Sequence, residues 1–435
     1  MKTKLALLLA TALAHGTFAA DTLRLKLEPD RDMVLKGSAQ EVVIKIDLEA
    51  ASKMKKTRRT PLNIAVVLDR SGSMTGAKLE KAKQAAALVV DRMAQDDIFS
   101  LVTYSDSSQV LVSAQRVEDK ERLRRKISQI EASGMTALHA GVKSGAAQLR
   151  EYLSDRRINR VILLSDGLAN VGPSSTSDLR RLGHELAADG IAVTTIGVGD
   201  DYNEDLMAGL AEASDANYYY VRDTEKLPQI FAKELGELLT IAARDVQIEV
   251  ICPRGVRPIG FIGRSEKFEN QRATVKLSHL TTGQNRNLFL RCRVDDDATP
   301  ELATVRVKYS DEIEGGQQST SSVARVRFTT DSGLAERSLN RAVIAEAEFI
   351  GNAVRKDEAL LAADSGNLKE AADKLRRQAS VLESNRQYAP ARLQEQIKNE
   401  AETLRRRSET LERGNYDSGF RKTMQAESFS IRNSK

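Results

Sequence analysis

Tryptophan is absent from this chain of 435 residues, and aromatic side chains make up only 4% of it. This composition argues against a carbohydrate-binding platform or a base-stacking surface, because both rely on exposed aromatic rings. Basic and acidic residues are nearly balanced, at 66 and 61. Because no strong excess of positive charge attracts a polyanion, nucleic acid is not an expected partner.

Histidine is also scarce, which limits the catalytic chemistry open to the chain. Beyond the first twenty residues only His139, His184 and His279 occur. His184 and Glu185 lack the second histidine of a zinc-protease helix, and no serine lies in a G-x-S-x-G turn. The phosphate-binding pattern G-x-x-x-x-G-K-[ST] is missing too. We therefore predict that the chain is not an enzyme.

Long apolar runs are lacking, and the one near the N-terminus is short. Lys2 and Lys4 precede an apolar run over 5–14, and Thr17-Phe18-Ala19 fits a small-x-small cleavage site. About ten apolar residues fall well short of the roughly 20 that span a bilayer. This pattern predicts a cleavable signal peptide over residues 1–19, no transmembrane segment in the mature chain, and a periplasmic or secreted location.

Cysteine occurs only twice, at Cys252 and Cys292, each in a strand-like run. In an oxidising compartment the two could form a disulfide across one small β domain. The alternative is a pair of unpaired buried thiols, and the sequence leaves both open.

Hydrophobic periodicity divides the rest of the chain. Alternating apolar and polar residues predict strands before residue 58 and again after residue 244, whereas the segment between them alternates buried strands with helices. The first strands are too few to bury a face alone. We therefore expect an α/β domain with a doubly wound, mostly parallel sheet, inserted in a small β-sandwich and followed by a C-terminal helical region. The expected boundaries are a signal peptide 1–19, N-terminal sandwich strands 20–58, an α/β domain 59–243, the β-sandwich 244–330, a helical region 331–412 and a polar tail 413–435.

Polar side chains follow the two most apolar strands, NIAVVLD (63–69) and RVILLSD (160–166). We expect these strands to be central neighbours in the sheet, and carboxyl ends of parallel strands meet at one edge. Asp69 and Asp166 end the two strands. Three hydroxyl side chains are expected at the same edge: Ser71, Ser73 and Thr136.

Carboxylates and hydroxyls without histidine or cysteine form an all-oxygen ligand set, which suits Mg²⁺ or Mn²⁺ better than Zn²⁺. Neutral hydroxyl ligands leave such an ion incompletely neutralised, with a coordination position free for a carboxylate from outside. The plainer alternative is that Asp69, Ser71 and Ser73 merely cap the helix that begins near Ala77.

Three motifs resemble the von Willebrand factor A domains: DRSGSM (69–74), GMTAL (134–138) and LLSDG (163–167). The resemblance covers roughly 61–243, and Met135 departs from it where a second glycine is common. It implies a metal-ion-dependent adhesion site made by Asp69, Ser71, Ser73, Thr136 and Asp166. The stretches PLNIAVVLDRSGSM (61–74) and LLSDGLANVGP (163–173), with strands of the expected sandwich on both sides, are similar to secreted bacterial YfbK-like proteins. They also resemble the A domains of inter-alpha-trypsin inhibitor heavy chains.

The resemblance implies that the bound ion grips an Asp or Glu of a protein partner, often with movement of the last helix of the domain, here 225–241. We therefore predict an extracytoplasmic adhesion or assembly module. The alternative is an envelope scaffold in which the metal only braces the loops, while the sandwich or the helices bind partners. The sequence leaves the oligomeric state open.

Overall fold

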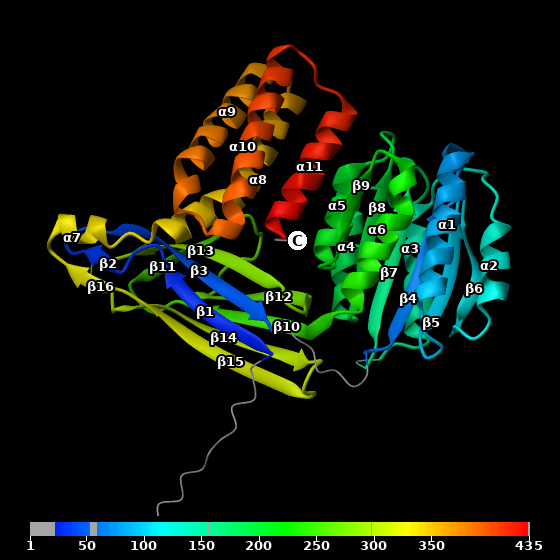
Figure 1. The fold of residues 1–435 in the computed structure, drawn as a ribbon, viewed down its shortest axis with the longest axis horizontal. Helices are drawn as coiled ribbons and strands as arrows, with labels where there is room; N and C mark the ends of the chain where they lie inside the picture. The colour runs from blue at the N-terminus through cyan, green and yellow to red at the C-terminus, as the bar shows by residue number, and fades with distance from the viewer. Residues whose placement is uncertain (1–21, 53–58, 155, 297, 434–435) are drawn as a thin grey trace, which may run out of the picture.

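The computed structural model describes residues 22–52, 59–154, 156–296 and 298–433. Figure 1 shows three parts: an α/β domain, a β-sandwich beside it, and a helical region that lies over the sandwich and reaches the α/β domain. The predicted signal peptide falls outside the described residues. None of the helices within these ranges is long and apolar enough to cross a membrane.

The α/β domain is built on a six-stranded sheet with the order β6-β5-β4-β7-β8-β9. Only β6 is antiparallel to its neighbour. The strands are β4 (Leu62–Asp69), β5 (Ile98–Tyr104), β6 (Ser108–Arg116), β7 (Ile158–Ser165), β8 (Ile191–Val198) and β9 (Tyr218–Val221). Residues of β4, β5 and β8 are buried throughout, as expected for parallel strands covered on both faces.

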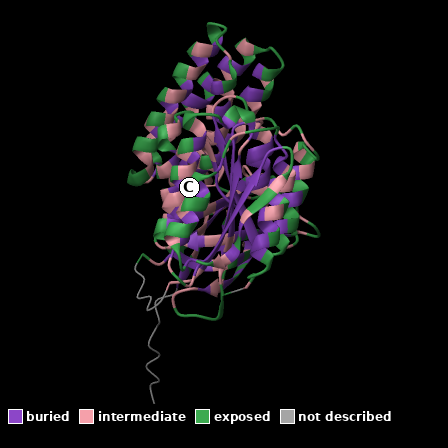
Figure 2. Ribbon diagram, turned by 90° about the vertical axis from the view of Figure 1, so that its right-hand side faces the viewer, coloured by how far each residue is buried: buried purple, intermediate pink, exposed green. Residues whose placement is uncertain are grey.

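Helices cover both faces of this sheet, and alternate side chains of β4 face opposite layers. Ile64 and Val66 pack with α1, α2 and α6, whereas Ala65 and Val67 pack with α3, α4 and α5. The helices are α1 (Ala77–Arg92), α2 (Lys120–Ser128), α3 (Leu138–Arg150), α4 (Thr176–Ala188), α5 (Glu204–Ala213) and α6 (Leu227–Leu238), with short 3₁₀ turns at Gly72–Met74 and Thr224–Lys226. Figure 2 shows the sheet strands as a buried layer between partly exposed helices.

The β-sandwich confirms the predicted insertion. The N-terminal strands β1 and β3 pair with β13 and β11, strands that follow the α/β domain in the chain. The first sheet contains β1 (Leu23–Pro29), β3 (Gln40–Ala50), β13 (Asn285–Val294) and β11 (Val256–Phe261). The second contains β12 (Arg272–Thr281), β10 (Ile241–Ile251), β14 (Glu301–Asp311) and β15 (Gln317–Arg325), and a small parallel pair joins β2 (Met33–Leu35) to β16 (Arg327–Thr329).

The two cysteines lie in the core of the sandwich. Cys252 and Cys292 belong to one cluster of buried apolar side chains, and both are free thiols. The structure therefore has the unpaired buried thiols rather than the disulfide.

The predicted C-terminal helical region contains five α-helices among the described residues. The helices are α7 (Ser332–Arg337), α8 (Arg341–Asp364), α9 (Leu368–Asn385), α10 (Ala391–Glu412) and α11 (Ser418–Arg432), with a 3₁₀ turn at Arg386–Tyr388. Residues 413–435, expected as a polar tail, thus contain α11. Its Met424 packs into the bundle core, and its Phe429 packs into the core of the α/β domain. The residues that bury Met424 and Phe429 lie far from α11 in the sequence, so the local pattern of 413–435 did not predict this helix.

Ionic contacts join the helical region to both other parts. In α8, Glu346 accepts from Lys45 of β3 at 2.8 Å, and both side chains are almost fully buried. In α11, Lys422 donates to Glu204 of α5 at 2.6 Å, and Arg421 contacts Glu204 and Asp205. The helical region therefore contacts both the sandwich and the α/β domain.

Candidate metal site

The two aspartates at the ends of the apolar strands lie side by side. The pairing of β4 with β7 confirms that the two strands are neighbours, with Leu68 opposite Leu164. Asp69 and Asp166 follow directly at the carboxyl edge, and both are fully buried. Two buried carboxylates at one sheet edge require compensation by hydrogen bonds or by positive charge.

Hydrogen bonds hold the Asp69 carboxylate in place. One oxygen accepts from the Ser71 amide and the other from the Ser165 hydroxyl, each at 2.8 Å. Burial raises the pKa of Asp69, and the nearby charge of Asp166 acts in the same direction, while the bonds from Ser71 and Ser165 oppose the rise. A divalent ion would relieve the repulsion between the two carboxylates.

The two motif serines form a chain of hydroxyls that leads to Asp166. The Ser71 and Ser73 hydroxyl oxygens lie 3.1 Å apart, and the Ser73 hydroxyl donates to Asp166 Oδ1 at 2.7 Å. Asp166 Oδ2 accepts from the Lys78 ammonium, also within hydrogen-bonding distance at 2.6 Å.

The backbone at Gly167 shows how closely the three hydroxyls converge. A Cβ added there would lie 3.1 Å from Thr136 Oγ1, 3.4 Å from Ser73 Oγ and 3.9 Å from Ser71 Oγ. Thr136 is held from behind, because its amide donates to Asn170 Oδ1 at 2.9 Å and its carbonyl accepts from the Asn170 amide. The structure thus brings all the sequence-predicted site residues together around one small space.

The capping alternative is wrong for these side chains. Helix α1 begins at Ala77, its N-cap is Gly76, and no described side chain caps it. Ser71 precedes the 3₁₀ turn over Gly72–Met74, again without a capping bond from its side chain. The hydroxyls of Ser71 and Ser73 point to each other and to Asp166, so helix capping does not explain them.

Three residues of the site escaped the sequence analysis. Ser165 lies inside the LLSDG motif, but a serine at the end of a buried strand carries no signal of its own. Asn170 follows that motif by three residues, in a loop where asparagine is common. Lys78 looks like one of several lysines along a helix surface.

These residues fit a hard, hydrated divalent ion. Carboxylate and hydroxyl oxygens are the ligands that Mg²⁺ and Mn²⁺ prefer. Across the described ranges, no group of three or more His, Cys, Asp or Glu side chains is arranged to hold a metal, so the site depends on its hydroxyls. The residues that would hold the ion are Asp69, Ser71, Ser73, Thr136 and Asp166.

The loops around this space carry two exposed apolar side chains. Met135 precedes Thr136 and is 51% exposed, and Leu168 follows Gly167 and is 59% exposed. The backbone bond from Asn170 to Thr136 joins their loops. The site is therefore bordered by apolar surface on both loops.

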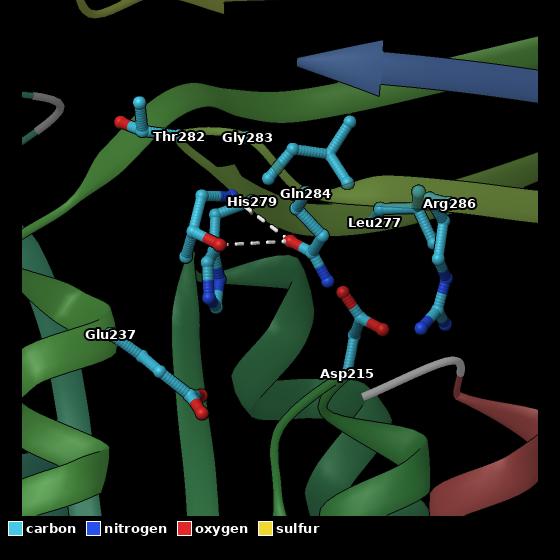
Figure 3. Close-up of a pocket in the computed structure, with 10 residues that line it drawn as sticks. Asp215, Glu237, Leu277, His279, Thr282, Gly283, Gln284 and Arg286 are labelled. Carbon is cyan, nitrogen blue, oxygen red and sulfur yellow. Dashed lines mark hydrogen bonds between the residues drawn. The ribbon is translucent and has the colours of Figure 1, made fainter. Parts of the chain in front are cut away.

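A cavity of about 270 Å³ lies elsewhere, where the α/β domain meets the sandwich. Figure 3 shows Asp215 and Glu237 on one side and His279, Gln284 and Arg286 on the other. Arg286 is 2% exposed and donates to Asn433 Oδ1 at 3.2 Å. Burial lowers the pKa of Arg286 to about 10, against the opposing effect of Asp215. Arg286 thus belongs to the contact region between the sandwich, the α/β domain and the end of the C-terminal helix.

The adjoining cleft, of about 920 Å³, is rich in arginine, but neighbouring carboxylates pair with several of these side chains. Arg180 pairs with Glu212 at 2.9 Å, and Arg244 pairs with Glu312 at 2.6 Å. Arg264 pairs with Glu266. Because these acids are already close, the cleft offers an incoming anion less attraction than its arginine content suggests.

The fold is a doubly wound α/β domain, and the candidate site is a set of carboxylate and hydroxyl oxygens at the carboxyl edge of its sheet. Residues 63–233 match the family model of the von Willebrand factor type A domain. The chain therefore contains such a domain, of a class that commonly binds a divalent metal and mediates protein–protein interactions.

Relatives confirm the resemblance seen in the motifs. The chain is 26% identical over 270 residues to the uncharacterized protein sll0103 of Synechocystis, covering 59% of this chain and 64% of that one. It is 26% identical to the uncharacterized protein YfbK of Escherichia coli, covering 53% and 41% of the two chains. It is 29% identical to human inter-alpha-trypsin inhibitor heavy chain H3, covering 35% and 18%. The matches thus span less than two thirds of each relative.

A solved structure supports the fold over most of the chain. A von Willebrand factor type A protein from Catenulispora acidiphila matches with a TM-score of 0.69 at 17% identity, covering 84% of this chain and 87% of that one. The shared fold extends beyond the α/β domain because the coverage far exceeds residues 63–233.

Proposed function

We propose that the chain is an extracytoplasmic binding module in which Mg²⁺ or Mn²⁺ grips an Asp or Glu of a protein partner. The observation that carries this proposal is the convergence of three hydroxyls beside two buried carboxylates, around Gly167. The two carboxylates and three hydroxyls leave coordination positions of the ion open, and an oxygen of a partner's carboxylate can fill one of them. The proposed location rests on the signal-peptide pattern in residues 1–19.

A binding role is proposed rather than a catalytic one. The ion would orient and attract a carboxylate, while Met135 and Leu168 would contact apolar side chains on either side of it. The preferred partner is therefore a protein segment with an acidic residue flanked by bulky apolar ones.

The experiment is affinity capture of partners from an extract of the source organism's envelope, using the mature chain. Captures are compared in Mg²⁺, in EDTA and with Asp69→Ala. Asp189→Ala serves as the matched control, because Asp189 is an exposed aspartate that pairs with Arg150 away from the site. A protein retained only by the wild type and the control in Mg²⁺ supports the proposal.

Retention in all samples would contradict it and favour the scaffold alternative. In that case the sandwich or the helical region carries the partner, and the polar network at the sheet edge only braces the loops. Circular dichroism on each sample establishes that a lost partner does not reflect lost folding.

A further inference from the structure

Lys78 places a positive charge directly on a candidate metal ligand. Its ammonium lies 2.6 Å from Asp166 Oδ2, and Asp166 is fully buried. A Cβ added at Gly199, which follows β8, would lie 3.6 Å from the same ammonium. The ammonium is therefore enclosed between the ends of two sheet strands, although the side chain as a whole is 29% exposed.

This contact differs from those of the other lysines on α1. Lys81 pairs with Glu225 and Lys83 with Glu80, both largely exposed acids, at 2.6 and 2.9 Å. Lys78 also lies in the first turn of α1, where the helix dipole disfavours positive charge. The attraction between Asp166 and the Lys78 ammonium opposes this effect of the helix dipole. Lys78 therefore differs from a lysine that is held only by solvent at the helix surface.

The net charge of the site depends on the Lys78 ammonium. With Asp69 and Asp166 ionised, Lys78 leaves the ion-free site with one excess negative charge. A divalent ion makes the site positive by one, and a single carboxylate from a partner makes it neutral. Without Lys78 the ion alone would neutralise the site, and the partner's carboxylate would leave it negative.

We propose that Lys78 is a resident cation that weakens binding of the metal alone and strengthens binding of a carboxylate to the metal-loaded site. This inference rests on the proposed function, since it concerns the same ion and the same partner group. The ammonium repels the ion and attracts the carboxylate. Metal and carboxylate then enhance each other's binding, because a coupling free energy acts equally on both.

The test measures Mn²⁺ binding to the full mature chain from the electron paramagnetic resonance signal of free Mn²⁺. Wild type is compared with Lys78→Met, which keeps the apolar stem but removes the charge. Lys81→Met is the matched control, because it removes the same charge from the same helix three residues away. Each protein is titrated in acetate and in chloride of equal ionic strength, with acetate as the carboxylate probe and its own Mn²⁺ binding subtracted.

We expect Lys78→Met to bind Mn²⁺ about tenfold more tightly than wild type in chloride, by loss of charge repulsion at short range. Acetate should tighten Mn²⁺ binding to wild type and to Lys81→Met, and the tightening should shrink or vanish in Lys78→Met. If Lys78→Met unfolds, Lys78→Gln provides the same comparison with an uncharged polar side chain.

Other outcomes separate the two proposals. Equal Mn²⁺ affinity in wild type and both variants would overturn the role of Lys78 but leave the metal site standing. Weaker binding by Lys78→Met would also overturn it, since Lys78 would then hold Asp166 in position for the metal. Absence of Mn²⁺ binding in every protein would overturn the metal site itself.

Discussion

The ring of Phe429 packs edge-on against the ring of Tyr218, with centroids 5.7 Å apart and planes at 79°. Phe429 belongs to α11 and Tyr218 to β9, so this contact seats the C-terminal helix in the core of the von Willebrand factor type A domain. Beside it, Lys422 lies over the ring of Tyr202 at 4.8 Å and pairs with Glu204. An apolar anchor and a charged contact thus act at one surface.

Removing the anchor should release α11. Phe429→Ala deletes a side chain that is 3% exposed, and such truncations cost about 3 kcal/mol or more. We expect amide hydrogen exchange in α11 and β9 to accelerate by the factor that this loss of free energy corresponds to. Leu361→Ala, at a side chain of α8 that is 66% exposed, is the control and should change exchange little. Unchanged exchange in Phe429→Ala would show that the ionic contacts alone hold the helix.

The threonine hydroxyl at the site can be removed without changing side-chain shape. Thr136→Val should weaken Mn²⁺ binding by about tenfold or more, because an uncharged oxygen ligand is replaced by a methyl group. Thr103→Val is the matched control, since Thr103 is buried in β5 and its hydroxyl has no hydrogen-bond partner among the described residues. Calorimetric titration measures both, and equal affinities would remove Thr136 from the ligand set.

The small space at Gly167 gives a steric prediction. Gly167→Ala would place a methyl group 3.1 Å from Thr136 Oγ1, so Mn²⁺ affinity should fall while the fold persists. Gly236→Ala in α6 meets no atom within 4 Å and should leave Mn²⁺ affinity unchanged while stabilising the chain by about 0.5–1 kcal/mol. Full Mn²⁺ affinity in Gly167→Ala would mean that the ion lies elsewhere.

The apolar border of the site should affect the partner and not the metal. Leu168→Asp places negative charge beside the position proposed for the partner's carboxylate, so capture in Mg²⁺ should fall at least about tenfold. Mn²⁺ affinity should stay the same or rise. Leu361→Asp introduces the same change on α8 and should retain the partner. Equal capture by both variants would exclude Leu168 from the binding surface.

The thiols should be unreactive in the folded chain. Burial raises the pKa of Cys252 to about 12 and also raises the pKa of Cys292, so the reactive thiolate is rare at neutral pH. We expect iodoacetamide to leave both unmodified in the native protein and to modify both after unfolding without reductant. Modification only after reduction would instead reveal a disulfide in the isolated protein.

The sequence allowed the sheet edge to be predicted because the relevant signals are local. Apolar runs identified β4 and β7, and the rule for parallel strands placed Asp69 and Asp166 together. The contacts of α11 could not be predicted in this way. Arg421 and Glu204 each look like solvated helix charges, and only the fold brings them together across more than 200 residues. Lys78 was missed for the same reason, since its distinguishing feature is the acid that it meets.

The insertion has a mechanical consequence. The α/β domain is entered through β4 at Leu62 and left after α6 at Leu238, and its flanking strands β3 and β10 belong to different sheets of the sandwich. Leu62 begins β4, so the chain enters the domain at the end of that strand opposite Asp69. A tensile load applied at the carboxyl edge of the sheet would divide between two covalent tethers, and each tether would pull on a separate sheet.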